Sequence, residues 1–194
     1  MKKSVAILVF DDVEVLDFAG PFEVFSVANE LRGYADFGVF TVAPRPGPLR
    51  ARNGLRVVPD HTLLSCPPVD VLVVPGGFGT RALAADPVTI EWIRSRALAA
   101  ELTLSVCTGS LLLAKAGLLD GLRVTTHHDL LDTLREMAPA ATVDPEARYH
   151  DNGAIVTAAG ISAGIDASLH LVSRLLGPGA SAATAAYMEY GPGR

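Results

Sequence analysis

The sequence has few charged residues and few cysteines for a chain of 194 residues. Only 19% of the residues are charged, against about 25% in typical globular proteins, while 49% are hydrophobic. Such a chain can bury a core, which excludes intrinsic disorder. Cys66 and Cys107 cannot form a disulfide framework, and neither stands at metal-ligand spacing from another cysteine or a histidine. We therefore expect a reducing compartment and no bound metal.

Long hydrophobic runs and basic runs are also missing. Apolar stretches such as 72–75 and 111–114 are far shorter than the ~20 residues that span a bilayer. The apolar segment 4–10 ends at two aspartates without a cleavage site, so we expect no signal peptide. With a net charge of −5 and no basic run longer than Lys2-Lys3, we expect no nucleic-acid binding. These absences predict a soluble cytoplasmic protein that neither binds nor crosses a membrane.

Short apolar segments alternate with longer segments of helical pattern. The former are rich in Val, Ile, Leu or Phe on both faces, which is typical of parallel strands covered by helices, and they lie at 4–10, 37–43, 69–74, 102–106 and 122–126. The predicted helices lie at 21–31, 88–100, 109–116, 128–137 and 162–176. Pro21 and Pro87 suit the first helical position, and Gly117 and Gly177 suit helix ends. With no linker or repeat, residues 1–194 are predicted to form one doubly wound α/β domain with helices on both faces.

Two Asn-Gly pairs interrupt this alternation. Asn53-Gly54 lies within segment 49–58, and Asn152-Gly153 lies within segment 149–157. Each pair predicts a β-hairpin with a type I′ turn. We expect both small hairpins at the edge or on the flank of the sheet.

Chemically active side chains follow the predicted strands. The first strand is followed by an acidic segment that includes Asp17, and the third by the glycine-rich segment 76–79. The fourth is followed by Cys107-Thr108-Gly109, and the fifth by His127-His128. Because ligands of such folds bind beyond the carboxyl ends of the strands, we expect these groups on one rim.

Cys107 stands between an apolar strand and a helix that begins with glycine. This is the strand–turn–helix context of a nucleophile elbow. A helix N-terminus beneath the sulfur would lower the pKa of the thiol and stabilise a thiolate. The alternative is a buried core cysteine, which the position at the rim disfavours. Cys66 is followed by two prolines and lies away from a strand end, so it is predicted to be structural.

The other residues of this rim each have two interpretations. Gly76 and Gly77 fit no phosphate-binding motif, so their amides either form an oxyanion hole or close a tight turn. Asp17 is either a solvated or helix-capping carboxylate, or an acid at the site. His127 and His128 would ordinarily be strand-end residues with satisfied hydrogen bonds.

With these residues taken together, the chain resembles the ThiJ/PfpI superfamily, within the class I glutamine amidotransferase-like fold, over nearly its whole length. The segments that carry the resemblance are 16–21, 73–77, 105–110, 116–121, 125–127 and 159–166. The resemblance implies a flavodoxin-like sandwich, Cys107 as nucleophile, Asp17 as the acid beside it and His127 as a supporting residue. It also implies a homodimer, for which the Ala-rich segment 180–186 offers spare apolar surface.

The residue after the cysteine divides the superfamily. Its peptidases and glyoxalase-like chaperones carry a histidine there, whereas this chain has Thr108. Asp17 together with Cys107-Thr108-Gly109 resembles the isonitrile hydratase branch. This implies that the cysteine adds to an isonitrile, that Asp17 delivers a proton, and that Thr108 holds the intermediate. It further implies Leu16 and Phe18 as walls for an apolar substituent, and no cofactor.

Three other functions stay open at this stage. The chain could be another cysteine-dependent enzyme of the superfamily, such as a glyoxalase or an amidase. It could be a redox sensor in which Cys107 is oxidised to the sulfinate. It could also be a non-enzymatic ligand-binding domain that works with a separate transcriptional regulator. Similar regulators carry AraC-type DNA-binding helices, which we do not expect in a sequence that stops at Arg194.

Overall fold

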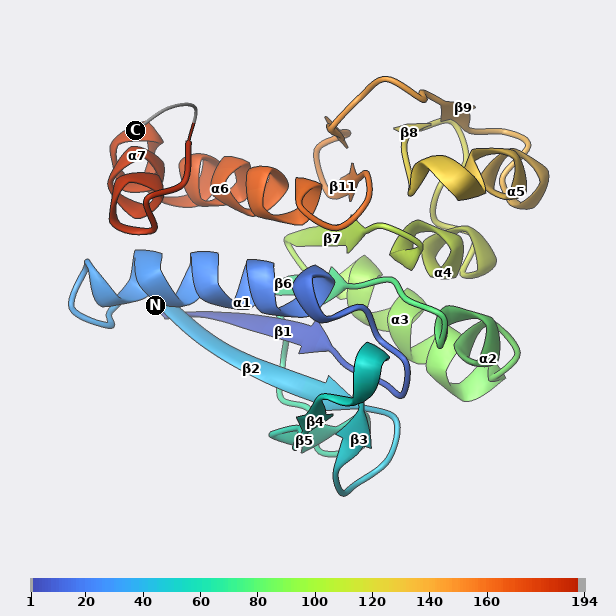
Figure 1. Ribbon diagram of the computed structural model, residues 1–194, viewed down its shortest axis with the longest axis horizontal. Coiled ribbons are helices and arrows are strands. Elements are labelled where there is room, and N and C mark those ends of the chain that lie inside the picture. The colour runs from blue at the N-terminus through green and yellow to red at the C-terminus, as the bar shows by residue number, and fades with distance from the viewer. Residues whose placement is uncertain (1, 192–194) are drawn as a thin grey trace.

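A seven-stranded sheet organises the computed structural model, which describes residues 2–191 (Figure 1). In spatial order, its strands are β10 (Tyr149–Asp151), β11 (Ile155–Ala158), β7 (Leu102–Val106), β6 (Val71–Val74), β1 (Lys3–Leu8), β2 (Phe37–Ala43) and β5 (His61–Thr62). All neighbours pair in parallel except β10, which is antiparallel to β11. Every residue of β6 and β7 is buried, as expected of strands covered on both faces.

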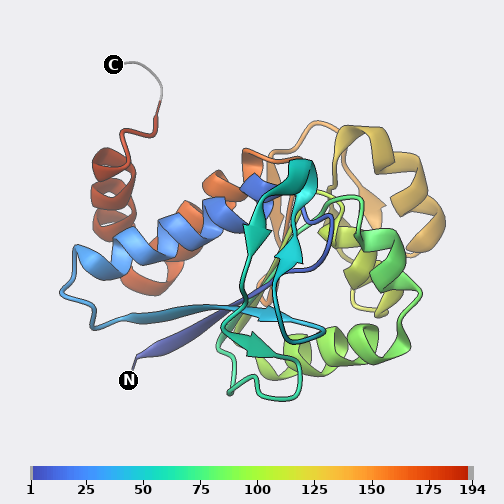
Figure 2. The same ribbon diagram turned by 60° about the horizontal axis from the view of Figure 1, so that its bottom comes forward.

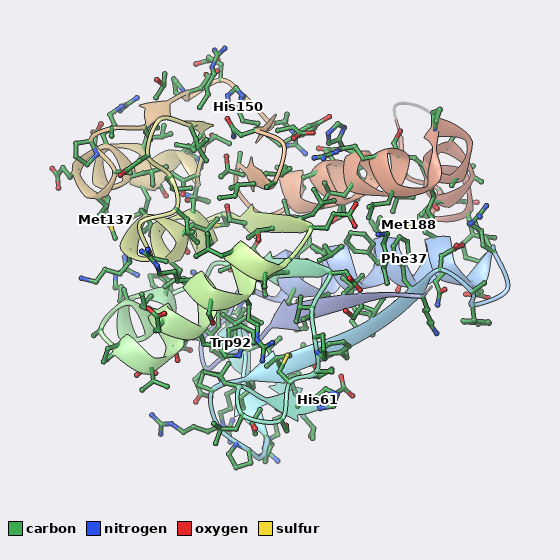
Figure 3. The ribbon with its side chains drawn as sticks, turned by 180° about the vertical axis from the view of Figure 1, so that it is seen from behind. Phe37, His61, Trp92, Met137, His150 and Met188 are labelled. Atoms are coloured by element: carbon green, nitrogen blue, oxygen red, sulfur yellow. The ribbon has the colours of Figure 1, made fainter. Side chains whose placement is uncertain are left out.

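Helices cover both faces of this sheet (Figure 2). Packed together on one face are α1 (Val15–Glu30), α6 (Ala163–Leu176) and α7 (Pro178–Tyr187). The other face is covered by α3 (Pro87–Ala99) and α4 (Gly109–Lys115), against which α2 (Thr80–Ala84) and α5 (Leu131–Met137) pack. Trp92, labelled in Figure 3, is one of the α3 side chains buried in the core. The predicted doubly wound α/β fold is confirmed. No helix among residues 2–191 is long and apolar enough to cross a membrane.

A fifth strand of the main sheet was predicted at 122–126, but this segment does not join that sheet. Its central residues form β8 (Arg123–Val124), which pairs in parallel with β9 (Thr142–Val143) outside the main sheet. Side chains of the hairpin 149–157 accept hydrogen bonds from the backbone of this segment: Asn152 Oδ1 accepts from Arg123 N–H, and Thr157 Oγ1 accepts from Thr125 N–H. The hairpin 149–157 lies at the edge of the main sheet, as expected, with β10 as the edge strand and β11 beside β7.

Both Asn-Gly hairpins form; the first has the positive φ at Asn53 and Gly54 that the predicted type I′ turn requires, whereas the turn of the second is shifted by one residue. Between β3 (Leu49–Arg50) and β4 (Arg56–Val57), the chain makes a 3-10 turn, η1 (Arg52–Gly54), in which Asn53 and Gly54 both have positive φ. In the second hairpin, Asn152 stays in the ladder, where its N–H bonds Ile155 C=O, and the turn residues are Gly153 and Ala154. A side-chain bond of Asn152 to Arg123 C=O favours this shifted turn.

The first helix begins six residues before the predicted start. Pro21 was expected at the first helical position but lies inside α1, which begins at Val15. Tertiary packing overrides the proline signal, because Gly20 fits closely against Ile165 of α6. The predicted helix 128–137 consists of a 3-10 turn, η2 (His128–Leu130), followed by α5. Asp86 and Pro87 cap α3 as predicted, with Asp86 accepting a bond from Val88 N–H.

The Ala-rich segment 180–186 keeps part of its expected spare surface, since Ala182, Ala183 and Ala186 are exposed. It belongs to α7, which packs against α6 and α1 and buries Thr184. The edge strand β5 with His61 (Figure 3) and the short helix α2 were also not predicted, because elements this short carry no periodic pattern.

Candidate active site

The predicted elbow is present at Cys107, between β7 and α4. Cys107 has a φ of 56°, in the left-handed region that side chains disfavour. Its N–H faces the carbonyls of Ala158 and Ala159 at 3.2 and 3.0 Å, and its carbonyl accepts bonds from Thr126 Oγ1 at 2.9 Å and Ser110 Oγ at 3.2 Å. These contacts hold the strained conformation from both sides.

Asp17 lies beside this elbow in the first turn of α1 and is fully buried. Its Oδ2 accepts a hydrogen bond from Gly76 N–H at 3.0 Å, and its Oδ1 has no nitrogen or oxygen partner among residues 2–191. Burial raises the pKa of the Asp17 carboxyl to about 7, outweighing the lowering by its bonds to Gly76 and Cys107. Asp17 is therefore not a solvated carboxylate; it titrates near neutral pH.

The pKa of Cys107 differs from the expected low value. Burial and the negative charge of Asp17 raise the pKa of the thiol to about 12, while the backbone N–H groups of Thr108 and Ile161 lower it. The expectation of a stabilised thiolate is wrong, because the elbow places the sulfur out of water and next to a carboxylate. The sulfur holds its proton in the resting protein, and Asp17 is the group positioned to accept it.

Gly76 and Gly77 bring the loop after β6 against Thr108. Gly77 N–H donates to Thr108 Oγ1 at 2.9 Å, so both glycine amides are engaged by protein groups. A Cβ on Gly76 would lie 2.5 Å from Thr108 N and 3.0 Å from Asp17 Oδ2. A side chain at position 76 is thus excluded, and the two amides orient Asp17 and Thr108.

A cavity of about 320 Å³ opens above the elbow. Its lining divides into a floor of Cys107, Thr108 and Gly77, apolar walls of Phe78, Leu130 and Ile161, and a charged rim of Glu14, Arg52, Arg81, His127 and Asp129. Leu16 and Phe18, the expected walls, lie outside this lining because both belong to α1. Phe18 is buried in the core, and Leu16 lies near Gly20 on the helix surface.

His127 lines the cavity, whereas His128 does not. Its Nδ1 accepts a bond from Asp129 N–H at 3.3 Å, which leaves the proton of the neutral ring on Nε2. The ring packs on Gly160, where a Cβ would lie 2.6 Å from His127 Cδ2. His127, His128 and Asp129 offer ligand atoms within 4.8 Å of one another, and are the side chains that could hold a metal ion. The two imidazoles stack at 4.3 Å, so their ring nitrogens do not converge well on one point.

Sequence reasoning missed most of the rim and did not identify the apolar walls. Arg52 comes from the β3–β4 turn, Arg81 from α2, and Ile161 from the turn after β11. None of these elements was predicted beside the cysteine. Of these three residues, only Ile161 could have been found from the sequence, because it lies in segment 159–166, which carries part of the superfamily resemblance.

Comparisons with known proteins find relatives over most of the chain. The profile of the DJ-1/PfpI family matches residues 3–174. An isonitrile hydratase from Pseudomonas putida is 38% identical over 99% of this chain and 80% of its own length. The HTH-type transcriptional regulator CdhR from Pseudomonas aeruginosa is 32% identical over 92% of this chain, which spans 52% of that regulator.

Solved structures show the same fold. A ThiJ/PfpI family protein from Pseudomonas syringae has a TM-score of 0.89 and 32% identity, covering all of this chain and 77% of its own. Drosophila melanogaster DJ-1beta has a TM-score of 0.85 at 20% identity, over 98% of this chain and 100% of its own, and shows the fold alone. The resemblance inferred from the sequence is confirmed: the chain belongs to the DJ-1/PfpI family.

Proposed function

We propose that the protein is a cysteine-dependent isonitrile hydratase, which converts an isonitrile and water into an N-substituted formamide. The observation that carries the proposal is the buried pair of Asp17 and Cys107 at the floor of the cavity. A carboxyl group with a pKa of about 7 can both accept and donate a proton at neutral pH. The 38% identity to an isonitrile hydratase supports the same reaction.

The first step joins the sulfur to the isonitrile carbon. An isonitrile carbon becomes electrophilic only as it is protonated, so the reaction needs an acid and a nucleophile at the same atom. Asp17 takes the proton from Cys107 Sγ and passes it to this carbon while the sulfur bonds to it. The product is the thioimidate R–N=CH–S–Cys107, which contains all atoms of both reactants.

The second step uses one water molecule. Water adds to the thioimidate carbon, and Asp17 accepts a proton from the water and returns one to the nitrogen. The carbon–sulfur bond then breaks while Asp17 carries the hydroxyl proton to the departing sulfur, which releases R–NH–CHO and regenerates the thiol. The N–H groups of Thr108 and Ile161, which face the sulfur, stabilise its negative charge as it leaves. His127 supports the reaction by positioning the water at the cavity wall. Acid, base and nucleophile are all protein groups, so these steps require no cofactor.

A paired substrate assay tests this proposal. The purified protein is offered an aryl isonitrile and, separately, methylglyoxal, the substrate of the competing glyoxalase hypothesis. We expect the N-aryl formamide from the first and no consumption of the second. Consumption of methylglyoxal without formamide would replace the hydratase by the glyoxalase.

Sensing is the second candidate, favoured by the two transcriptional regulators CdhR and GbdR, which are 32% and 30% identical to this chain. A sensing domain would bind a small molecule at the cavity, or undergo oxidation of Cys107, without turnover. If neither substrate is converted, and a small molecule raises the unfolding temperature of the protein, this candidate would be favoured over the hydratase.

We further propose a homodimer. Leu16 on α1 and Ile161 in the turn between β11 and α6 are each 37% exposed, leaving apolar surface beside these two helices. Sedimentation equilibrium at micromolar concentration should give twice the chain mass of 20.3 kDa. A mass of one chain would remove this proposal without affecting the hydratase.

A further inference from the structure

We propose that Arg81 binds a carboxylate on the substrate, so that the preferred isonitriles of this protein are negatively charged. The inference rests on the proposed function for the reaction and on the geometry of the cavity for the binding. It names a substrate class that the conversion of isonitriles does not by itself specify.

The shape of the cavity fixes the direction of the substituent. Cys107 is only 6% exposed and forms the floor, whereas Phe78 is 53% exposed and Arg81 is also exposed. The R–N≡C group is linear. When its carbon reaches Cys107 Sγ, the substituent therefore points away from the sulfur, toward the open end of the cavity.

Two guanidinium groups meet the substituent at this open end. Arg52 Cζ lies 4.1 Å from the centre of the Phe78 ring, and Arg81 Cζ lies 5.3 Å from the same centre. Phe78 thus offers an aromatic surface for the substituent and carries two cations beside it.

The two arginines of the rim differ in their partners. Arg52 pairs with Glu14 at 3.6 Å, and Asp129 Oδ1 lies 3.2 Å from His128 Nε2. Arg81 has no ion pair or side-chain hydrogen bond within residues 2–191. The guanidinium of Arg81 retains its planar set of N–H donors, which match a carboxylate in a two-bonded geometry. An anionic substituent would give Arg81 an ion-pair partner, whereas a cationic substituent would be repelled by this guanidinium.

Two aryl isonitriles, one with a carboxylate and one without, test the inference. Phenyl isocyanide and 4-isocyanobenzoate share the ring and the reacting group. We expect a higher kcat/KM for 4-isocyanobenzoate by about tenfold, as for a charge-assisted bond at a partly exposed site. This preference should shrink as the salt concentration rises. Equal values for the two substrates, or a preference for the neutral one, would overturn the inference.

Variants assign the preference to Arg81. We expect Arg81→Gln to bring the ratio of the two kcat/KM values close to one, and Arg81→Lys to retain most of it because the positive charge remains. The matched control is Arg135→Gln, since Arg135 lies on α5, pairs with Asp132 and does not line the cavity. The control should keep both kcat/KM values. An unchanged ratio in Arg81→Gln would contradict the assignment.

Binding separates this inference from the proposed function. Calorimetry on Cys107→Ala, repeated on Asp17→Asn, measures the affinity for both compounds without turnover. Tighter binding of 4-isocyanobenzoate that is lost with Arg81→Gln supports the carboxylate site, even if neither compound yields a formamide. In that case the hydratase fails and the anion site stands. Equal affinities would overturn the anion site, even if both compounds are converted.

Discussion

Cys107 and Cys66 are alike in burial and in the direction of their pKa shifts, but they differ in backbone conformation and in neighbouring groups. The two residues are 6% and 8% exposed, and burial raises the pKa of both thiols. Cys66 lies in the loop between β5 and β6, where its sulfur donates to the neighbouring Pro67 carbonyl. Cys107 has a left-handed backbone, a buried carboxyl group beside it and a cavity above it. A site is therefore distinguished by the partner and the backbone of its cysteine, not by burial or by the direction of a pKa shift.

The glycines around the two cysteines show the same difference. Near Cys107, a Cβ at Gly76 or Gly109 would lie 2.5 Å or less from backbone atoms of neighbouring segments. Cys66 is instead followed by Pro67 and Pro68, which restrict the backbone of its own loop. At Gly76 and Gly109, neighbouring segments thus approach so closely that a side chain would not fit, and both positions lie in the region that holds Asp17, Thr108 and the Cys107 sulfur.

The largest contrast is expected from removing each sulfur. Cys107→Ser should lower the turnover of an aryl isonitrile by about 10⁴-fold or more, because the alcohol is a far weaker nucleophile in this surrounding. Cys66→Ser should keep the rate of the wild type. Steady-state rates of formamide production measure both variants. A loss confined to Cys66→Ser would reverse the assignment of the site.

The second-largest effect is expected from replacing Asp17, the carboxyl partner of Cys107. Asp17→Asn should lower the hydratase rate by about 10²–10⁴-fold, the usual contribution of general acid–base catalysis. Alkylation of Cys107 should become faster at pH 8, since the variant removes a negative charge that raises the pKa of the thiol. Paired pH profiles of alkylation and formamide production check both effects. A hydratase rate within about threefold of the wild type would exclude Asp17 as the proton carrier.

Asp17 also makes the stability depend on pH. Because its pKa is about 7 in the folded protein and 3.8 as the ordinary value, the folded state binds this proton more tightly. The contribution of Asp17 to the free energy of unfolding is complete below pH 4 and is lost as the pH rises through 7, by about 4 kcal/mol in all.

Urea unfolding at pH 5 and pH 8 measures this slope. Asp17→Asn should remove most of it, while Asp132→Asn, at a 91% exposed side chain on α5, should leave it unchanged. Equal slopes in the wild type and Asp17→Asn would show that the buried carboxyl is not the titrating group.

The smallest effect is expected from replacing single glycines by alanine, which changes the stability of the protein. Gly76→Ala should destabilise the protein by about 1–3 kcal/mol and reduce activity, because its Cβ would overlap Thr108. Gly179→Ala in α7, where no atom lies within 4 Å of the new Cβ, should instead stabilise the protein by up to about 1 kcal/mol. Thermal unfolding of the two variants provides the comparison. Similar shifts in both would mean that the close contact at Gly76 relaxes freely.

The buried strands were predictable because their pattern is local. The segment 102–106 is β7 to the residue, and 37–43 is β2, since apolar residues on both faces leave few alternatives. The interpretation failed where a distant segment decides the outcome. Residues 122–126 have the pattern of a strand, but β11 occupies the place beside β7. No local signal reports that competition.

The candidate site divides in the same way. Cys107 and Asp17 were found from their position after strands and from the resemblance, but the helical setting of Asp17 and the raised pKa of Cys107 were not. Both depend on which atoms surround the residue after folding. Arg52 and Arg81 reach the rim from a turn and a short helix, elements with no sequence periodicity to reveal them.

The bonds that hold the Cys107 elbow have a consequence for biosynthesis. The carbonyls that receive its N–H belong to Ala158 and Ala159, more than fifty positions downstream of the cysteine. A ribosome-bound chain that has not yet released β11 has the Ser110 and Thr126 bonds to the Cys107 carbonyl but lacks the two carbonyls that receive its N–H. Under the proposed function, we therefore expect a truncated product ending before β11 to be inactive even though it contains both Cys107 and Asp17.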